Sequence, residues 1–311
     1  MAVLPAAAND TLATLGAGGL VPAKSTQISM EREDLQISMH QVTVRYLFRN
    51  HSAQDVEATV AFPLPELEGG TVEHVPLQLP HRSQVNFVDF AVTVGGKAVA
   101  VQTEVRALHD GRDITDRLRA AGLPVSVIDE HFGEAVRKLS AAQRRQFEKD
   151  ELVVSDDGGS RYWPNWKTKV QFYWTQRFPA RGTVEVQHQY RPVVGGSYLT
   201  AADDGASRIK PYCGGPEIVP QILAVKKRHP LKNPDEPALY EKQIQYILTT
   251  ANNWSGPIAD FKLTVIADSP DDIVLTCLLG LKRLGPTRYE LVRNNFRPVR
   301  DLDLLILHAG R

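Results

Sequence analysis

Alternation of apolar and polar residues dominates the first hundred positions of the chain. Every second residue is apolar from Val42 to Phe48 and again from Val56 to Phe62, where Pro63 ends the run. Proline cannot donate to a strand ladder, so the second strand must stop there or reach a sheet edge. The alternation from Phe90 to Val94 runs into Gly95-Gly96, a two-residue hairpin signal. These short strands predict an antiparallel β-sandwich.

A helical period replaces the alternation between about residues 108 and 150. Asp113 can cap a short helix that Gly122 ends. Apolar residues then recur at helical spacing, at Ile128, Phe132, Val136 and Leu139. The pattern predicts a helical insertion with one apolar stripe, and the charged run after it is expected to be a solvated face.

Strands return in the second half of the chain, on either side of a stretch rich in Pro, Gly and charge. Alternation marks residues 170–174 and 184–190, and further apolar runs extend from Ile244 to Leu307. The sequence therefore predicts a mainly β fold of two antiparallel sandwich-like modules. The first module is expected over residues 9–200, with the helical insertion, and the second over 241–311. Residues 201–240 are expected to form a linker or crossing loop.

Composition excludes several classes of protein. The 311 residues carry 36 Lys and Arg against 36 Asp and Glu, so the formal net charge is zero. Broad nucleic-acid binding requires a basic surplus and is not expected. With 42% hydrophobic and 23% charged residues, the chain has a globular composition. No apolar run reaches the 18 residues that a transmembrane helix needs.

The first residues and the two cysteines bear on the compartment. Ala6 and Ala8 fit the A-x-A pattern of a signal-peptidase site, so residues 1–8 are interpreted as a signal-peptide remnant and the mature chain as starting near Asn9. An ordinary disordered N-terminus is the alternative. Cys213 and Cys277 lie in no metal-binding motif. Export would favour a disulfide between them, whereas a cytosolic chain would hold two buried thiols.

Signatures of catalysis are absent from the sequence. There is no G-x-S-x-G, H-E-x-x-H, P-loop or G-x-G-x-x-G motif, so no catalytic residue, metal ligand or cofactor is assigned. No two histidines have the i, i+4 spacing of a helical metal pair. His188 shares a strand face with Val186 and Tyr190 and is expected to be a hydrogen-bonded core histidine. The acidic clusters, at Asp203-Asp204, Asp268 to Asp272 and Asp301 to Asp303, are expected to serve turns and solubility.

Tryptophans provide the candidate ligand contacts. Trp163 and Trp166 flank Pro164 in an aromatic-rich segment, and Trp254 lies in a turn that contains Gly256. Exposed indole faces can stack on sugars or apolar ligands, and this is one interpretation of the three residues. Packing in the core is the other.

The N-terminal strands resemble the vault-inter-alpha-trypsin (VIT) type of β domain. The resemblance rests on a strand that ends at Asn50, a turn, and a strand that ends in Phe62-Pro63-Leu64-Pro65. The Gly95-Gly96 hairpin and the strand through His188 follow in the expected order. The helical insertion departs from this pattern, so the match is partial.

A second resemblance covers nearly the whole chain. Its motifs include Asn9-Asp10-Thr11, Gly18-Gly19-Leu20, His188-Gln189-Tyr190, Tyr212-Cys213, Asn253 to Ile258, Cys277 and Pro286 to Glu290. Together they resemble a family of bacterial secreted proteins known as domain of unknown function 4424. The resemblance implies a bacterial exported protein and supports pairing Cys213 with Cys277. It implies no activity.

These observations favour a non-enzymatic, exported binding or protein-interaction module of the bacterial cell envelope, periplasmic or secreted. Its partner would be an envelope protein or a glycan. Two alternatives remain from the sequence: a carbohydrate-processing or carbohydrate-binding envelope protein, and a periplasmic carrier of a small ligand or metal. The carbohydrate enzyme would need two carboxylates at hydrolytic separation near a tryptophan.

Overall fold

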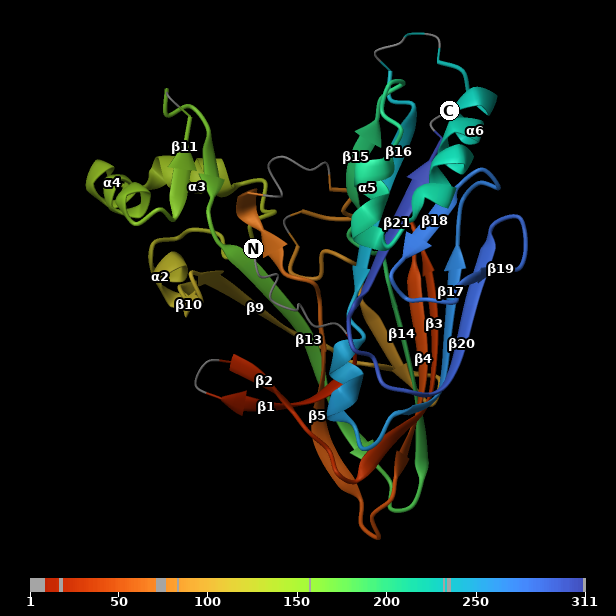
Figure 1. Ribbon diagram of the computed structural model, residues 1–311. Helices are drawn as coiled ribbons and strands as arrows, with labels where there is room; N and C mark the ends of the chain where they lie inside the picture. Colours follow the sequence, from red (N-terminus) through yellow and green to blue (C-terminus); the bar gives the residue numbers. More distant parts are fainter. Residues whose placement is uncertain are drawn as a thin grey trace.

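The computed structural model describes residues 9–16, 19–70, 77–82, 84–156, 158–231, 233 and 236–309. The expected signal-peptide remnant, residues 1–8, lies outside them. The described residues form a mainly β fold with short helices, as the sequence predicts (Figure 1). Four sheets are present in this part of the chain, with seven, eight, four and two strands. The two-stranded sheet pairs β11 (Val153–Ser155) with β12 (Tyr162–Pro164).

The seven-stranded sheet contains the first strand and the longest one. Its order is β10-β9-β13-β5-β1-β2, with β6 paired to β13, and all its pairs are antiparallel. The strands are β1 (Thr11–Gly16), β2 (Gly19–Ala23), β5 (Val56–Pro63), β6 (Leu67–Glu68), β9 (Gln102–His109), β10 (Arg112–Asp113) and β13 (Lys167–Phe178).

The eight-stranded sheet joins strands from both halves of the chain. Its order is β19-β20-β17-β3-β4-β14-β7-β8. The strands are β3 (Ile28–Ser38), β4 (Val42–Asn50), β7 (Ala91–Val94), β8 (Lys97–Val99), β14 (Thr183–Tyr190), β17 (Ile258–Ile266), β19 (Lys282–Arg283) and β20 (Arg288–Phe296). Along β4 the apolar residues at every second position are buried, which confirms the predicted alternation.

The two large sheets bury aromatic side chains between them. Phe62 on β5 and Phe172 on β13 both stack on Phe90, which precedes β7, with ring centroids 4.9 and 4.4 Å apart. Offset stacking at these distances adds to the burial of the rings. Trp174 and His188 meet edge to face at 5.2 Å in the same layer. The main core therefore lies between the sheets, as in a sandwich.

The helical insertion lies to one side of the sheets (Figure 1). It comprises α2 (Thr115–Ala120), α3 (Phe132–Lys138) and α4 (Ala141–Lys149). The predicted stripe is buried, with Phe132 and Val136 on α3 facing the core. A capping box at Ser140 begins α4. Within the described residues, no helix has the length and apolar character that crossing a membrane requires.

The expected division into modules 9–200 and 241–311 does not fit the strand pairing. β17 pairs in parallel with β3, and β17 and β20 extend the same sheet as β4 and β14. One core cluster contains residues from both expected modules. Alternation identifies a strand and its buried face, but it does not identify the strand's partner, so the sequence could not locate this parallel pairing.

The expected linker, residues 201–240, is also different in the structure. It contains α5 (Ala206–Ile209), η1 (Lys210–Tyr212), η2 (Pro216–Ile218) and α6 (Val219–Arg228). Prolines that suggest a loop occupy the first turns of η2 and α6, where a missing N–H is tolerated. Ile209, Ile222 and Val225 pack on the four-stranded sheet in a second core. That sheet has the order β15-β16-β21-β18, with β15 (Gly195–Leu199), β16 (Leu239–Tyr246), β18 (Ile273–Thr276) and β21 (Leu302–His308).

Candidate functional site

A disulfide joins the helical layer to the four-stranded sheet. Cys213 directly follows η1, Cys277 directly follows β18, and their Cα atoms are 5.0 Å apart. Cys213 adopts a left-handed backbone conformation with φ of 58°, which turns the chain at the end of η1. The bond therefore fixes the start of the α6 segment against the end of an outer strand.

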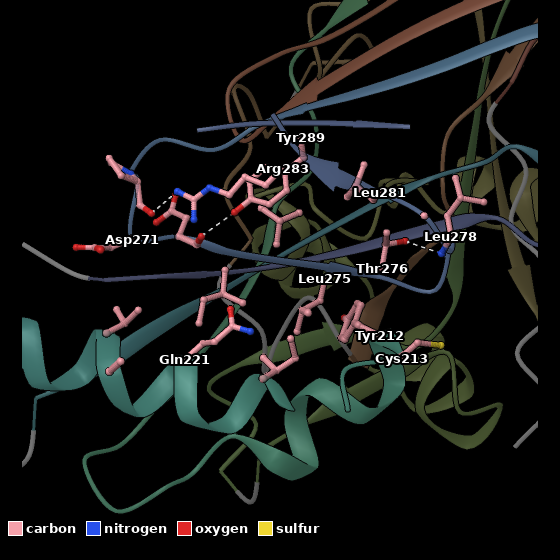
Figure 2. A pocket seen from close by; sticks show the side chains of 18 of the residues that line it. Tyr212, Cys213, Gln221, Asp271, Leu275, Thr276, Leu278, Leu281, Arg283 and Tyr289 are labelled. Atoms are coloured by element: carbon pink, nitrogen blue, oxygen red, sulfur yellow. Dashed lines mark hydrogen bonds between the residues drawn. The ribbon is translucent and has the colours of Figure 1, made fainter. Parts of the chain in front are cut away.

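An open groove of about 530 Å³ begins beside this disulfide and runs between α6 and β18 (Figure 2). Four residues of α6 line it with the i, i+3, i+4, i+7 spacing of one helix face: Gln221, Ala224, Val225 and Arg228. Leu275 on β18 forms the floor, and Leu279 in the following loop stands at the rim with 75% of its surface exposed.

The opposite wall belongs to the hairpin of β19 and β20. Arg283 donates to the carbonyl oxygens of Pro270, Gly285 and Pro286, and its guanidinium lies 5.6 Å from the centre of the Tyr289 ring. The Tyr289 hydroxyl donates to the backbone oxygen of Asp272 at 3.1 Å. Because these side chains are held by backbone groups, the wall is preorganised.

Charges at one end of the groove are paired with each other. Arg228 and His229 both donate to Asp271, each at 2.7 Å, and these hydrogen bonds, from His229 first and Arg228 second, hold the pKa of Asp271 below its ordinary value. Asp272 accepts from His308 at 2.7 Å and from the backbone nitrogens of Asp268 and Ser269. In the described part of the chain, no group of three or more His, Cys, Asp or Glu residues could hold a metal ion.

The free edge of β18 gives the groove backbone groups that can form hydrogen bonds with a ligand. β18 is an outer strand of its sheet, paired only with β21 within the described residues. An outer strand presents unpaired backbone donors and acceptors that can pair with an added strand. Apolar side chains beside such an edge can recognise alternate side chains of an extended segment. The groove therefore combines the two features of a site that binds an extended segment, a free strand edge and apolar side chains beside it.

The predicted tryptophan contacts do not meet in the structure. Trp166 and Trp254 are each only 3% exposed, so neither offers an indole face to a ligand. Trp166 donates to the Val125 carbonyl at 2.9 Å and packs on Phe132, and Trp254 packs on Phe48 with ring centroids 4.5 Å apart. The core interpretation fits both residues. The indole N–H of each donates to a backbone oxygen, that of Trp254 to Asp10 at 2.6 Å.

Trp163 is half-buried on β12, beside the helical insertion. Trp254 directly follows the 3-10 helix η3 (Thr249–Asn253), and Trp163 does not line the groove. Its contact with a ligand stays a prediction.

A second cluster, which the sequence analysis did not find, lies inside the core. We call it the buried acidic cluster: Asn9, Asp10, Glu33, Tyr46, His188 and Tyr246, all 1% exposed or less. Glu33 accepts hydrogen bonds from the Asn9 side chain at 3.1 Å and from the Tyr246 hydroxyl at 3.3 Å. Tyr46 donates to the Asn9 side-chain oxygen at 2.6 Å. The cluster thus connects the N-terminal residues to β3, β4 and β16.

Two members of the cluster lack hydrogen-bond partners among the described residues. Both carboxylate oxygens of Asp10 and both ring nitrogens of His188 are without one, although Asp10 Oδ1 lies 3.4 Å from His188 Nε2. The prediction for His188 was therefore right about burial and wrong about hydrogen bonding. Its neighbours are mostly aromatic rings, and those of Phe62, Phe90 and Trp174 carry no ring acceptor.

Burial controls the protonation of this cluster. It raises the pKa of Glu33 to about 8, against the opposing effect of hydrogen bonds from Asn9 and Tyr246. Burial, and then the charge of Glu33, raise the pKa of Asp10 well above its ordinary value. Burial also lowers the pKa of His188 to about 3. Desolvation disfavours every charged form, so at neutral pH Glu33 is mainly protonated and His188 is neutral.

Glu33 reaches the core because of an irregularity in β3 that the sequence does show. Apolar residues occupy even positions at Ile28 and Met30 and odd positions at Leu35 and Ile37. This change of phase corresponds to a register shift between Met30 and Arg32 against β4. After the shift, Glu33 faces the core with Leu35.

The fold and the groove define a mainly β protein with an open binding groove beside a disulfide. A family model described as a domain of unknown function, DUF4424, matches residues 8–305, so the chain belongs to this family. No curated protein matches the chain. The similarity of the N-terminal strands to the VIT domain stays a prediction.

Among solved structures, the chain is similar to a protein from Legionella pneumophila subsp. pneumophila str. Philadelphia 1, described as a "putative nutrient binding protein". The TM-score is 0.50 at 16% identity, over 97% of this chain and 70% of that one. At this identity the likeness concerns the fold.

Proposed function

We propose that the chain is a non-enzymatic binding module, exported to the bacterial cell envelope, that accepts an extended segment of a partner protein in the groove. The observation that carries the proposal is the free edge of β18 along the groove floor. Strand addition would satisfy the unpaired backbone groups of this edge, and Leu275 and Leu279 would contact the partner's apolar side chains.

Export is supported by the disulfide and by the signal-peptidase pattern at Ala6 and Ala8. Disulfides persist in oxidising compartments such as the bacterial periplasm. Cys213 is exposed in the structure, so a reducing cytosol would have access to the bond. A periplasmic or secreted location is therefore part of the proposal.

A small apolar or amphipathic molecule is the second candidate occupant. The groove volume of about 530 Å³ is within the usual range for small-ligand sites. The similar Legionella pneumophila protein is described as a "putative nutrient binding protein", which is consistent with this occupant. A carbohydrate ligand has less support, because Trp166 and Trp254 are buried.

Peptide display tests the groove. Octapeptides displayed on phage should yield binders of wild type, and Ala224→Trp, which fills the groove from α6, should weaken their binding at least about tenfold. Lys227→Trp adds the same side chain to α6 outside the groove lining and should leave binding unchanged. Melting temperatures of both variants should match wild type.

Backbone methylation separates the two occupants. N-methylation at alternate residues of a selected peptide removes donors that strand addition needs, so one methylation pattern should abolish binding and the pattern shifted by one residue should not. Equal binding of both methylated peptides would contradict strand addition and favour recognition of side chains alone. Failure to select any peptide displaced by Ala224→Trp would contradict the protein-binding proposal.

A further inference from the structure

The first residues of the described chain are more deeply buried than is usual for a terminal segment. Asn9, Asp10 and Thr11 are each 0% exposed. The Asn9 carbonyl accepts from Thr250, and the Asp10 carbonyl accepts from Trp254 at 2.6 Å. Terminal residues are commonly poorly ordered unless specific contacts hold them, and here hydrogen bonds hold the backbone and the side chains of Asn9 and Thr11.

The six residues of the buried acidic cluster include no Lys or Arg. Among the described residues, no Lys or Arg forms an ion pair with Asp10 or Glu33. The nearest basic group is His188, which burial keeps neutral. Two buried carboxyls without a counter-ion are costly in any ionised state. Asp10 in particular presents two oxygens inside the core that have no hydrogen-bond partner in the described part of the chain.

The sequence places a processing pattern at the residue that enters this cluster. Ala6 and Ala8 form the small-residue pattern of a signal-peptidase site, which ends directly before Asn9. Hydrolysis of the peptide bond between Ala8 and Asn9 consumes one water. Its oxygen stays with the Ala8 carbonyl carbon as a carboxylate, and the Asn9 nitrogen becomes an α-ammonium group. The required co-reactants are water and an envelope peptidase.

We propose that the chain is cut between Ala8 and Asn9 and that the α-ammonium group of Asn9 is the buried counter-ion of Asp10 and Glu33. Asn9 contacts Glu33 through its side-chain Nδ2 and precedes Asp10 directly, so cleavage would create the new amine on a residue of this cluster. Processing then completes the core, and the fully stable fold forms only after the leader is removed. The inference rests on the proposed export but not on the proposed groove.

Three chains test the counter-ion: residues 9–311 with a free Asn9 amine, residues 8–311 with the amine one residue further out, and the full chain. Each is released from a fusion by a protease that leaves no extra residue. At pH 6.5 the 9–311 chain should have an unfolding equilibrium constant at least about tenfold smaller than that of the 8–311 chain. Only in the 9–311 chain does the Asn9 α-ammonium group lie beside Asp10 and Glu33.

Substitution of the carboxyls provides the matched control. In the Asp10→Asn/Glu33→Gln double variant, the advantage of the 9–311 chain over the 8–311 chain should disappear. Equal stability of the two wild-type chains, or a difference that survives the double substitution, would contradict the proposal that the Asn9 amine is the counter-ion.

Amine reactivity gives a second measurement, which does not depend on stability. Acetylation by an N-hydroxysuccinimide ester at pH 7.5, followed by mass spectrometry of the N-terminal peptide, should be at least about tenfold slower for the folded 9–311 chain than for the folded 8–311 chain. Equal rates would show that the Asn9 amine is outside the core. The mass of the chain from the envelope fraction of its own cells should correspond to an Asn9 start, and any other start would overturn the processing site. Neither measurement depends on peptide binding, so failure of the groove proposal would be seen separately.

Discussion

The full chain, with residues 1–8 retained, is expected to lose stability as the pH rises from 6.5 to 8, and Glu33→Gln should reduce this loss by about 2 kcal/mol. Glu33 has a pKa of about 8 in the folded protein, against an ordinary value of 4.5 in the unfolded chain. In this window the folded state retains a proton that the unfolded state has released. Stability from Glu33 is therefore full below pH 4.5, falls as the pH rises, and levels off above about 8.

The other members of the buried acidic cluster shape the rest of the profile. Asp10 also has a raised pKa, so its contribution to stability likewise falls as the pH rises. His188 acts in the opposite direction, because its pKa is lowered from 6.5 to about 3. Its contribution is full above pH 6.5 and falls as the pH decreases toward 3. His188→Leu should therefore flatten the acid side of the profile and leave the side above pH 6.5 unchanged.

Urea unfolding at half-unit steps from pH 4 to 9 measures these slopes. Glu185→Gln is the control for removing a glutamate, because Glu185 is exposed on β14. Its profile should be parallel to that of wild type. The shape of each profile is compared, so a variant that is less stable at every pH still gives an answer. Parallel profiles for Glu33→Gln and wild type would contradict the buried protonated carboxyl.

Local periodicity was sufficient to predict several elements of the fold. The alternation from Val42 to Phe48 corresponds to β4 and its buried face, and the helical spacing through Phe132 and Val136 corresponds to α3. Both predictions depend on which face of one element is buried, and a short window of sequence contains that information.

Predictions that depended on distant partners were less successful. The parallel pairing of β17 with β3 brings residues more than 220 positions apart into register, for example Leu263 with Leu35. A linker was predicted over residues 201–240 because the stretch is rich in Pro, Gly and charge, whereas in the structure Pro220 lies in the first turn of α6. In both cases contacts with segments distant in sequence stabilise the observed structure, and a short window of sequence does not contain them.

The groove and the buried acidic cluster show why sites are harder to predict than elements. The groove combines one face of α6 with an outer strand and a hairpin, three segments that share no sequence motif. The acidic cluster contained a readable signal, the change of alternation phase before Leu35, which places Glu33 on the inner face. For Trp254 the sequence left core packing and ligand contact both open, because a turn-rich segment does not reveal that its indole reaches Asp10.

Removal of the disulfide is expected to lower the free energy of unfolding by about 4 kcal/mol in oxidising buffer, the chain-entropy value for its sequence separation of 64 residues. The loop that it closes contains α6, β16 and β17, so the bond restricts the unfolded ensemble across both the four-stranded and the eight-stranded sheets. Cys213→Ser is the test variant. The left-handed backbone at position 213 is unfavourable for serine and cysteine alike, so the substitution isolates the cross-link.

Reductant provides the control for this prediction. Wild type and Cys213→Ser should differ by about 4 kcal/mol in urea unfolding without reductant and should coincide in dithiothreitol, because the reduced wild type lacks the same cross-link. Cys277→Ser should give the same result as Cys213→Ser, and the double variant should add no further loss. An equal difference with and without reductant would mean that the cysteine side chains stabilise the fold by packing. The bond would then be incidental to the stability of α6 against β18, and the groove would keep its shape in a reducing compartment.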